Sequence, residues 1–387
     1  MPNTNIENMI AELSEVANHP KRQFEKFKAE GKKVIGIMPY HVPEEMVYAA
    51  GMVPMGMWGS NKKNISRAKE YCATFYCSLA QIDLEMLMDG TCDGMAGVIT
   101  PTPCDTLRPM SQNVKVAVEG KMKPIFFAHP QRRSDEAGKR FTMHMYKMIK
   151  ADLEEIAGAP IGDEALWNAI KVYNRFRRAQ RRFIELAGEH PEAISAVNRS
   201  AVLKANYFML KDVYAEKLEK LNEALEALPA SKWDGVKVMT SGIICDNPEL
   251  LKLFDQHNIC ICCDDIAHES RNIATDVPED MDDPMEALVQ QWADTINDPI
   301  YWDECSRQHR RAKSLIRKAR KYGAKGMVLF MMVFCDPEET DYPHIKDDFD
   351  IADIPQIRLG LDHQMRSFGQ IDTSLQAFAD MLAERDY

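Results

Sequence analysis

The sequence predicts an α/β protein built from two doubly wound, parallel-sheet modules that a helical segment joins. Three observations support this class. Short apolar, strand-like segments alternate with helical segments in the first third of the chain and again in the last third. The part between them carries long charged helical patterns and no strand-like segment. The two alternating parts also echo each other, because each has a strand, a short polar loop, a Pro-Glu pair and a helix. Modules of the Rossmann or flavodoxin type fit this pattern.

The first module is expected over residues 1–142. Its first thirty or so residues predict a helix, because apolar side chains recur at helical spacing from Ile6 to Val16. A strand-like segment at 34–40 follows, and then a helix whose first turn holds Glu44 and whose stop is Gly51. The stretch KEYCATFYCSLAQIDLEMLMDG predicts a loop leading into a second helix, and GVITP and PIFFAHP predict further strands. This alternation indicates a parallel sheet.

A helical segment is expected over residues 143–232. It contains a run of basic residues that would also suit a nucleic-acid surface: Arg175, Arg177, Arg178, Arg181 and Arg182. A solvated helix face beside acidic partners is the favoured interpretation, because the chain has a formal net charge of -11.

The second module is expected over residues 233–387. Alternation resumes there with the segments VKVMTSGIICDNPELLKLF, NICICCDDIAH, GMVLFMMVFCDP and IPQIRLGLD. The cleft between two such modules is a common place for a cofactor.

Composition narrows the classes of partner. The 387 residues suffice for two or three domains with full cores, and 45% hydrophobic with 28% charged residues is typical of a globular protein. The negative charge argues against nucleic acid or an anionic membrane as partner. The first residues are polar, and the longest apolar run, 326–335, is too short to span a bilayer. We therefore expect a cytoplasmic protein.

Ten cysteines in a cytoplasmic chain indicate metal or redox chemistry more than disulfides. Cys104 ends the run GVITPTPCDT and Cys335 ends GMVLFMMVFCDP, so both follow a strand and precede an aspartate. Thiols at strand carboxyl ends face the crevice where open α/β sheets bind ligands. Two of them and a third nearby could hold an iron–sulfur cluster with one free iron in the cleft between the modules.

The third thiol is either Cys72 or Cys77. On one helix the two would point about 140° apart, so both could bind one cluster only if the segment is not helical. The alternative for any single cysteine is an inert buried thiol. The remaining cysteines do not form a zinc motif: Cys262 and Cys263 should lie on opposite strand faces, and Cys92, Cys245, Cys260 and Cys305 have no supporting pattern.

Polar candidates for acid–base work are His41, His129 and His268, which follow strand-like segments, and Glu44. For each of these, a structural hydrogen bond or a helix-start role is the alternative. Glycine-rich phosphate loops and the GxSxG nucleophile motif are absent from the sequence, so ATP hydrolysis by this chain is not expected.

Long stretches of the chain resemble the 2-hydroxyacyl-CoA dehydratase family, which also includes the benzoyl-CoA reductases. The strings that carry the likeness are GKKVIG, VPEEMVYAAGMVPMGMWGS, SRAKEYCATFYC, CDTLRPMSQN, RSAVLK, TSGIICDNPELL, DDIAHESR and FCDPEETDYP. They span essentially the whole chain. The likeness is to the smaller, beta-type subunits, particularly of the members acting on (R)-2-hydroxyglutaryl-CoA.

The resemblance implies a [4Fe-4S] cluster held by Cys77, Cys104 and Cys335, with Cys72 in a structural role. It also implies a heterodimer with a larger alpha-type subunit, an ATP-dependent iron–sulfur activator that delivers one electron, and flavin in some members, for which no separate motif is visible here. The implied reaction removes water from the acyl-CoA through a ketyl radical and gives glutaconyl-CoA.

Two alternatives stay open. The same chemistry could act on a lactyl, isocaproyl or aryl substrate. This chain could also relay or hold the electron without touching the substrate, which in this family is thought to meet the cluster of the larger partner. Arg108, beside Cys104, bears on this second choice, because it could meet an anionic substrate or brace the loop.

Overall fold

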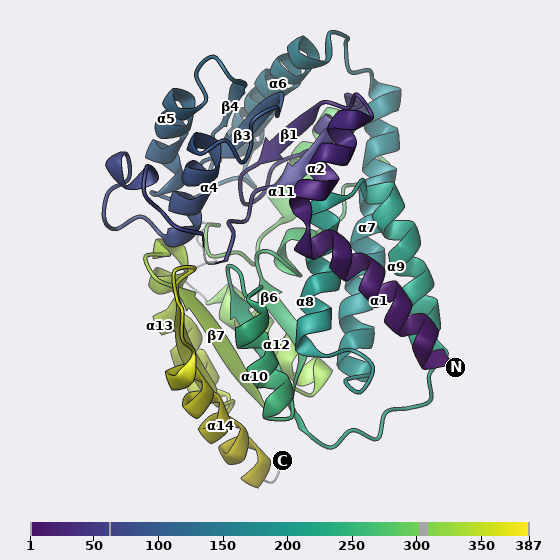
Figure 1. Cartoon of the computed structure of the whole chain (residues 1–387), viewed down its shortest axis with the longest axis vertical. Coiled ribbons are helices and arrows are strands. Elements are labelled where there is room, and N and C mark those ends of the chain that lie inside the picture. Colours follow the sequence, from purple (N-terminus) through teal and green to yellow (C-terminus); the bar gives the residue numbers. More distant parts are fainter. Residues whose placement is uncertain (1, 62, 302–308, 386–387) are drawn as a thin grey trace.

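The structure, a computed structural model, describes residues 2–61, 63–301 and 309–385. Within these ranges it contains two four-stranded sheets, and every strand pair is parallel. The predicted α/β class with two parallel-sheet modules is therefore confirmed. Figure 1 shows one sheet in each half of the molecule, with the long helices along one side.

The first sheet has the strand order β2-β1-β3-β4. Its strands are β1 (Val34–Ile37), β2 (Val53–Gly56), β3 (Gly97–Pro101) and β4 (Lys123–Phe127). The sequence analysis expected three of them and missed β2. This strand lies at the edge of the sheet and contains Pro54, a residue that weakens a strand pattern but is tolerated at a sheet edge.

Helices cover both faces of this sheet. One face packs against α2 (Pro20–Ala29), α4 (Ser78–Met88) and α5 (Leu107–Ala117). The other packs against α3 (Glu44–Ala49), α6 (Glu136–Ala157), α7 (Asp163–Glu189) and α11 (Pro284–Asp294). The short 3-10 helix η1 (Ala68–Glu70) precedes α4.

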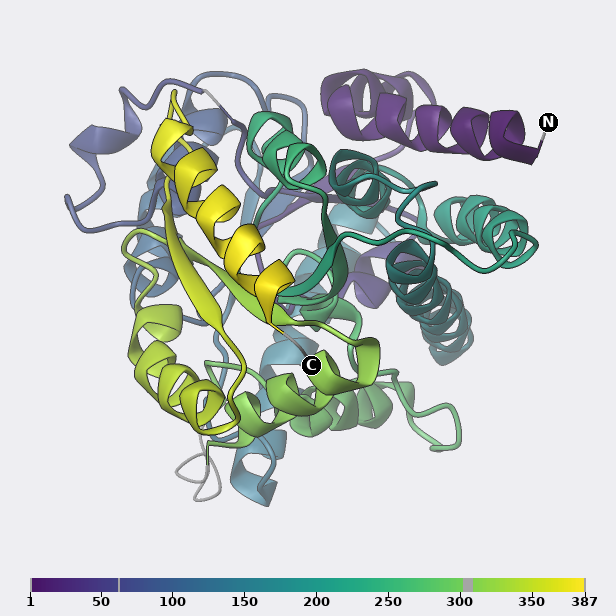
Figure 2. The same cartoon turned by 90° about the horizontal axis from the view of Figure 1, so that it is seen from below.

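The second sheet has the order β6-β5-β7-β8. Its strands are β5 (Val236–Gly242), β6 (Ile259–Ile266), β7 (Gly326–Met332) and β8 (Gln356–Leu361). The helices α10 (Pro248–Gln256) and α14 (Gly369–Glu384) cover one face, and α12 (Arg310–Tyr322) and α13 (Asp336–Ile351) cover the other (Figure 2). A 3-10 helix, η3 (Arg271–Ile273), follows β6.

Between the sheets in sequence lie α7, α8 (Ala196–Ala205), the 3-10 helix η2 (Asn206–Phe208) and α9 (Lys211–Glu226), against which α1 (Pro2–Asn18) packs. Helix α6 begins before the expected boundary at 142 and packs on β4, so it is one of the helices that cover the first sheet. The exact domain boundaries stay a prediction.

The basic run on α7 lies beside acidic residues. The pairs are Arg175 with Glu219, Arg177 with Glu45, Arg178 and Arg181 with Asp276, and Arg182 with Glu226. This is the arrangement that the charge balance favoured over a nucleic-acid surface. Among the described residues, no helix combines the length and the apolar character that crossing a membrane requires.

In each sheet the chain connections run in opposite directions on the two sides of the second strand in the order, and this position is a topological switch point. In the first sheet β1 lies between β2 and β3, and in the second β5 lies between β6 and β7. Open α/β sheets bind ligands at the carboxyl ends of the strands that flank such a switch. The loops after β3 and β7 occupy equivalent positions here, and they carry Cys104 and Cys335.

Candidate functional site

Three cysteines from separate segments line one cavity between the two modules. Cys104 comes from the loop after β3, Cys335 from the loop after β7, and Cys77 from the residue before α4. The cavity has a volume of about 680 Å³, part of it open to solvent. Its other walls are mainly apolar and include Trp58 and Ile300. The structure thus brings together the three thiols that the sequence analysis singled out.

Each of these thiols lies at the start of a helix. Cys77 is the N-cap residue of α4, and Cys335 is the N-cap residue of α13. The Cys104 sulfur accepts a contact of 3.5 Å from the backbone N–H of Leu107, the first residue of α5. Helix N-termini carry partial positive charge and unpaired N–H groups, so all three positions favour thiolate sulfur and the negative charge of a bound cluster.

Burial opposes ionisation of the same thiols. Burial, helped by the neighbouring Cys104, raises the pKa of Cys77 to about 12 against backbone N–H groups that lower it. Burial also raises the pKa of Cys104 and of Cys335, and for Cys335 the charges of Glu338 and Cys77 add to the effect. As free groups the three are therefore neutral thiols, and a bound cation would be needed to hold them as thiolates.

The donor set fits an iron–sulfur cluster. Three soft sulfur ligands face one apolar space, which is the chemistry that such clusters prefer. In the described ranges, no three His, Cys, Asp or Glu side chains converge on a point where they could share one metal ion. A cluster does not need such convergence, because each cysteine binds a different iron.

Cys72 lies outside this cavity, and the geometric argument about it needs correction. The segment from Cys72 to Cys77 is not one helix, because Cys72 lies in a turn after η1 and α4 begins only at Ser78. Helical geometry therefore does not separate the two thiols. Cys72 instead packs beside the core of the first module, and burial raises its pKa to about 11.

The remaining described cysteines are buried elsewhere. They are Cys92, Cys245, Cys260, Cys262 and Cys263. None of these five lines the cavity. Cys305 falls outside the described residues.

The polar residues proposed from sequence do not line the cavity either. Glu44 pairs with Lys211 at 3.2 Å on the side of the helical segment. The Arg108 side chain is exposed and has no hydrogen bond or ion pair with any described residue. His129 lies behind His41, with its Nε2 2.9 Å from the His41 carbonyl oxygen.

His268 is fully buried against the rings of Trp58 and Tyr207. Neither of its ring nitrogens has a hydrogen-bond partner among the described residues. Burial lowers the pKa of His268 to about 3, so the ring is neutral.

The end of β1 supplies a polar cluster that the sequence did not reveal. Tyr40 and His41 both have positive φ, 98° and 56°, an uncommon conformation that marks a constrained turn. Tyr40 lines the cavity, and its hydroxyl donates to a carboxylate oxygen of Asp298. His41 Nε2 lies 2.9 Å from the same oxygen.

Asp298 is the centre of that cluster. Burial raises its pKa, but the hydrogen bond and charge of His41 and the charge of Arg133 outweigh burial and hold the pKa below the ordinary value. Asp298 is therefore an anion that orients Tyr40 toward the cavity. It lies 258 positions from Tyr40, so no local pattern could have paired them.

A second carboxyl, Asp83, lies on the cavity wall and is fully buried. One of its oxygens accepts the backbone N–H of Gly59 at 2.9 Å, and the other has no partner among the described groups. Burial raises the pKa of Asp83 well above the ordinary value and so favours the neutral form of this carboxyl. Its place in the middle of α4, six positions after Cys77, is the only sequence signal that could have indicated it.

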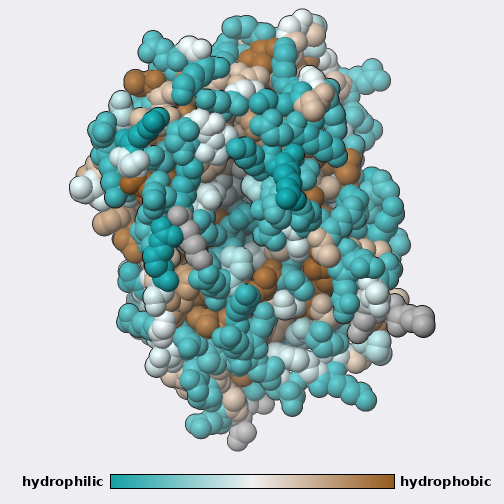
Figure 3. All heavy atoms as spheres, viewed as in Figure 1, coloured by the Kyte–Doolittle hydropathy of each residue, from teal (hydrophilic) through white to brown (hydrophobic). Residues whose placement is uncertain are grey.

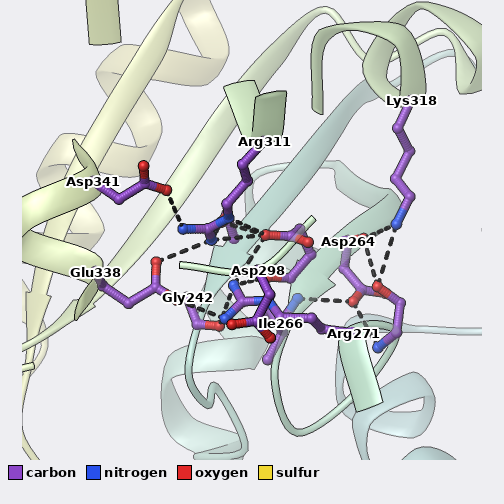
Figure 4. A network of polar contacts seen from close by, with 12 residues as sticks. Gly242, Asp264, Ile266, Arg271, Asp298, Arg311, Lys318, Glu338 and Asp341 are labelled. Carbon is purple, nitrogen blue, oxygen red and sulfur yellow. Dashed lines mark hydrogen bonds and ion pairs between the residues drawn. The ribbon is translucent and has the colours of Figure 1, made fainter. Parts of the chain in front are cut away.

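A buried charge network joins the end of β6 to the first turn of α13 (Figure 4). Arg271 donates to Glu338 at 2.7 Å and lies 2.9 Å from Asp265. Arg311 contacts the same two carboxylates, at 3.0 and 2.7 Å. Glu338 is in the first turn of α13, so the network fixes the start of that helix, and with it Cys335, to the end of β6.

Comparison with known proteins shows the family of this chain. A family model described as 2-hydroxyglutaryl-CoA dehydratase, D-component, matches residues 39–382. The beta subunit of (R)-2-hydroxyglutaryl-CoA dehydratase from Acidaminococcus fermentans is 52% identical over 97% of this chain and 100% of its own length. The beta subunit of lactoyl-CoA dehydratase from Anaerotignum propionicum is 39% identical, over 97% of this chain and 99% of its own.

A more distant relative is one of the subunits of benzoyl-CoA reductase from Thauera aromatica, which is 25% identical over 91% of each chain. The family model covers most of the chain, and the two beta subunits named above exceed 30% identity over nearly their whole length. The chain therefore belongs to the family of 2-hydroxyglutaryl-CoA dehydratase D-components, a family of dehydratase subunits.

Proposed function

We propose that this chain is the beta-type, iron–sulfur subunit of a dehydratase that converts (R)-2-hydroxyglutaryl-CoA to glutaconyl-CoA. The observation that carries the proposal is the convergence of Cys77, Cys104 and Cys335 on one cavity. The 52% identical relative that carries this substrate in its name supports the choice of substrate. Its partners would be an alpha-type subunit and an ATP-dependent activator that supplies one electron.

The chain's own residues have three tasks in this proposal. Cys77, Cys104 and Cys335 hold a [4Fe-4S] cluster, and the N-termini of their helices stabilise its negative charge. Apolar walls such as Trp58 and Ile300 exclude water. The Glu338 network keeps Cys335 in position. When bound, a cluster with one open iron supplies a one-electron donor and a Lewis acid.

The cavity favours an electron-holding role for this subunit over direct contact with substrate. Besides the three thiols, only a few of its lining residues carry a polar side chain, and one of these, Tyr40, is already bonded to Asp298. A thioester with a distal carboxylate would need several polar partners there. Arg108, the cation nearest in sequence to Cys104, does not line the cavity. The elimination would then take place on the partner subunit.

Iron analysis tests the ligand set. The chain, coexpressed with its partner and purified without oxygen, should contain about four irons and four sulfides per beta chain. Cys77→Ala, Cys104→Ala and Cys335→Ala should each lower this content and the visible absorption, whereas Cys72→Ala and Cys92→Ala should not. Unchanged iron and sulfide in the first three variants would contradict the proposal. Extraction of the same samples reveals whether flavin is also bound.

Turnover with the partner and activator tests the substrate. (R)-2-hydroxyglutaryl-CoA should be preferred over lactyl-CoA and isocaproyl-type substrates in kcat/KM. A preference for a substrate without the distal carboxylate would overturn the glutaryl assignment and leave the cluster assignment intact.

A further inference from the structure

A second concave site lies between the modules, separate from the cysteine cavity. It is a groove bounded by α2, by the end of β2 and the loop after it, and by α8 and α10. Figure 3 shows the molecule hollowed on this face. The groove has a volume of about 1810 Å³, including the part open to solvent. Typical small-molecule pockets measure about 300–1,000 Å³, so a ligand of nucleotide size fits.

The charge of the groove is opposite to that of the whole protein. Its walls carry Lys21, Lys63, Lys204 and Lys252 against one carboxylate, Asp246. The chain as a whole has a net charge of -11. A local excess of lysines in an acidic protein attracts anionic ligands.

Two of these lysines have no internal partner. Lys204 pairs with Asp246, and Lys63 lies 2.6 Å from Asp89. Lys21 and Lys252, by contrast, are exposed and make no ion pair or hydrogen bond with any described side chain. Lys21 lies in the first turn of α2, where the helix N-terminus adds to the attraction for an anion, and Lys252 lies in the middle of α10.

The floor of the groove is apolar and adaptable. It is formed by the side chains of Phe24, Met55, Met57, Met86, Met95 and Phe208. Methionine side chains accommodate flat rings of varied shape and make favourable contacts with them. Ser200, on α8, is 4% exposed, and its hydroxyl has no partner within the described part of the chain. An apolar floor beneath a basic rim suits a ligand with a ring at one end and phosphate at the other.

We propose that this groove binds a nucleoside phosphate, with its phosphates on Lys21 and Lys252 and its base on the methionine floor. Coenzyme A and a free adenine nucleotide share this chemistry. The proposal does not depend on the iron–sulfur cluster. The groove does border the same loop as the cysteine cavity, however, because Met57 and Gly59 line the groove while Trp58 lines the cavity.

Calorimetric titration of the full chain with its partner, without oxygen, tests the site with ADP, coenzyme A and inorganic phosphate as probes. ADP and coenzyme A should bind, inorganic phosphate should bind more weakly, and added salt should weaken all three. Lys21→Glu with Lys252→Glu should weaken nucleotide binding about tenfold or more, because two attractions become repulsions. Coenzyme A binding more tightly than ADP would identify coenzyme A as the ligand, and equal affinity would identify a free nucleotide.

A double variant with the same charge change elsewhere is the control. Lys26→Glu with Lys232→Glu alters two exposed lysines that do not line the groove, one of them on the same helix as Lys21. It should bind like the unmodified protein, and circular dichroism should show that both double variants are folded. Absence of nucleotide binding, an affinity and a number of binding sites that are unchanged in the groove variant, or inorganic phosphate binding as tightly as ADP would each overturn the proposal. Iron content, measured separately, decides the proposed function.

Discussion

At the scale of residues, each of the three cavity thiols combines two opposing influences. Burial keeps Cys77 neutral as a free group, while its place at the start of α4 favours a thiolate once a cation is bound. The same holds for Cys104 and Cys335. A site of this kind stays protonated and unreactive until metal arrives, and it then holds its sulfur ligands firmly.

The buried carboxyl of Glu269 should make the stability of the fold depend on pH. It is fully buried and shares the guanidinium of Arg199 with Asp264. Burial raises its pKa from 4.5 to about 7, against the attraction of Arg199. A carboxyl with a raised pKa stabilises the fold below its unfolded pKa, and this contribution is lost as pH rises through about 7.

The substitution Glu269→Gln should remove this loss of stability at rising pH. Its free energy of unfolding, measured by urea titration at pH 5, 6, 7 and 8, should improve relative to the unmodified protein as pH rises, by up to about 3 kcal/mol. Glu119→Gln, at an exposed position, should follow the unmodified protein at every pH. Parallel pH profiles for Glu269→Gln and the unmodified protein would contradict the assignment.

At the scale of elements, the strands with clear apolar runs were predictable. The segment GVITP was expected as a strand and forms β3 over Gly97–Pro101. The repeated strand followed by Cys-Asp was visible for the same reason, because both β3 and β7 are buried along their whole length. Apolar periodicity and strand ends are local features, and the sequence carries them directly.

Other features depended on contacts that the sequence does not show locally. The expectation that Cys262 and Cys263 lie on opposite faces assumed regular alternation. In the structure, Val238 pairs with Ile261 and Met239 with Cys263, so Cys262 falls in an irregularity and both thiols pack in the same apolar cluster. The Arg271–Glu338 network and the Tyr40–Asp298 pair likewise join distant segments.

Close packing of α7 on β6 gives a prediction at this scale. Gly188, in the last turn of α7, faces the backbone of Cys262, and a Cβ there would lie 2.6 Å from its carbonyl oxygen. Gly188→Ala should therefore separate the two elements and lower the free energy of unfolding by about 1–3 kcal/mol. Gly369→Ala, where no atom lies within 4 Å, should be neutral or slightly stabilising. Urea unfolding of both variants measures the change in the free energy of unfolding. If Gly188→Ala were as stable as the unmodified protein, α7 could shift without cost.

At the scale of the whole molecule, the cysteine cavity belongs to neither module alone. Cys77 and Cys104 come from the first module, and Cys335 comes from the second. A group bound to all three would connect the modules covalently. Because such a group binds the folded state and not the unfolded chain, it would stabilise the fold by mass action.

Removal of the metal should therefore loosen both modules together. Hydrogen exchange of the protein as isolated without oxygen, before and after iron is stripped by a chelator, should become faster at the starts of α4, α5 and α13. The temperature of unfolding should fall at the same time. Helix α9, which lies in the helical segment and does not line the cavity, should keep its exchange rate and serve as the internal reference. In Cys335→Ala the start of α13 should already exchange fast, so stripping should change it little. Faster exchange confined to one module would show that the bound group does not connect the two.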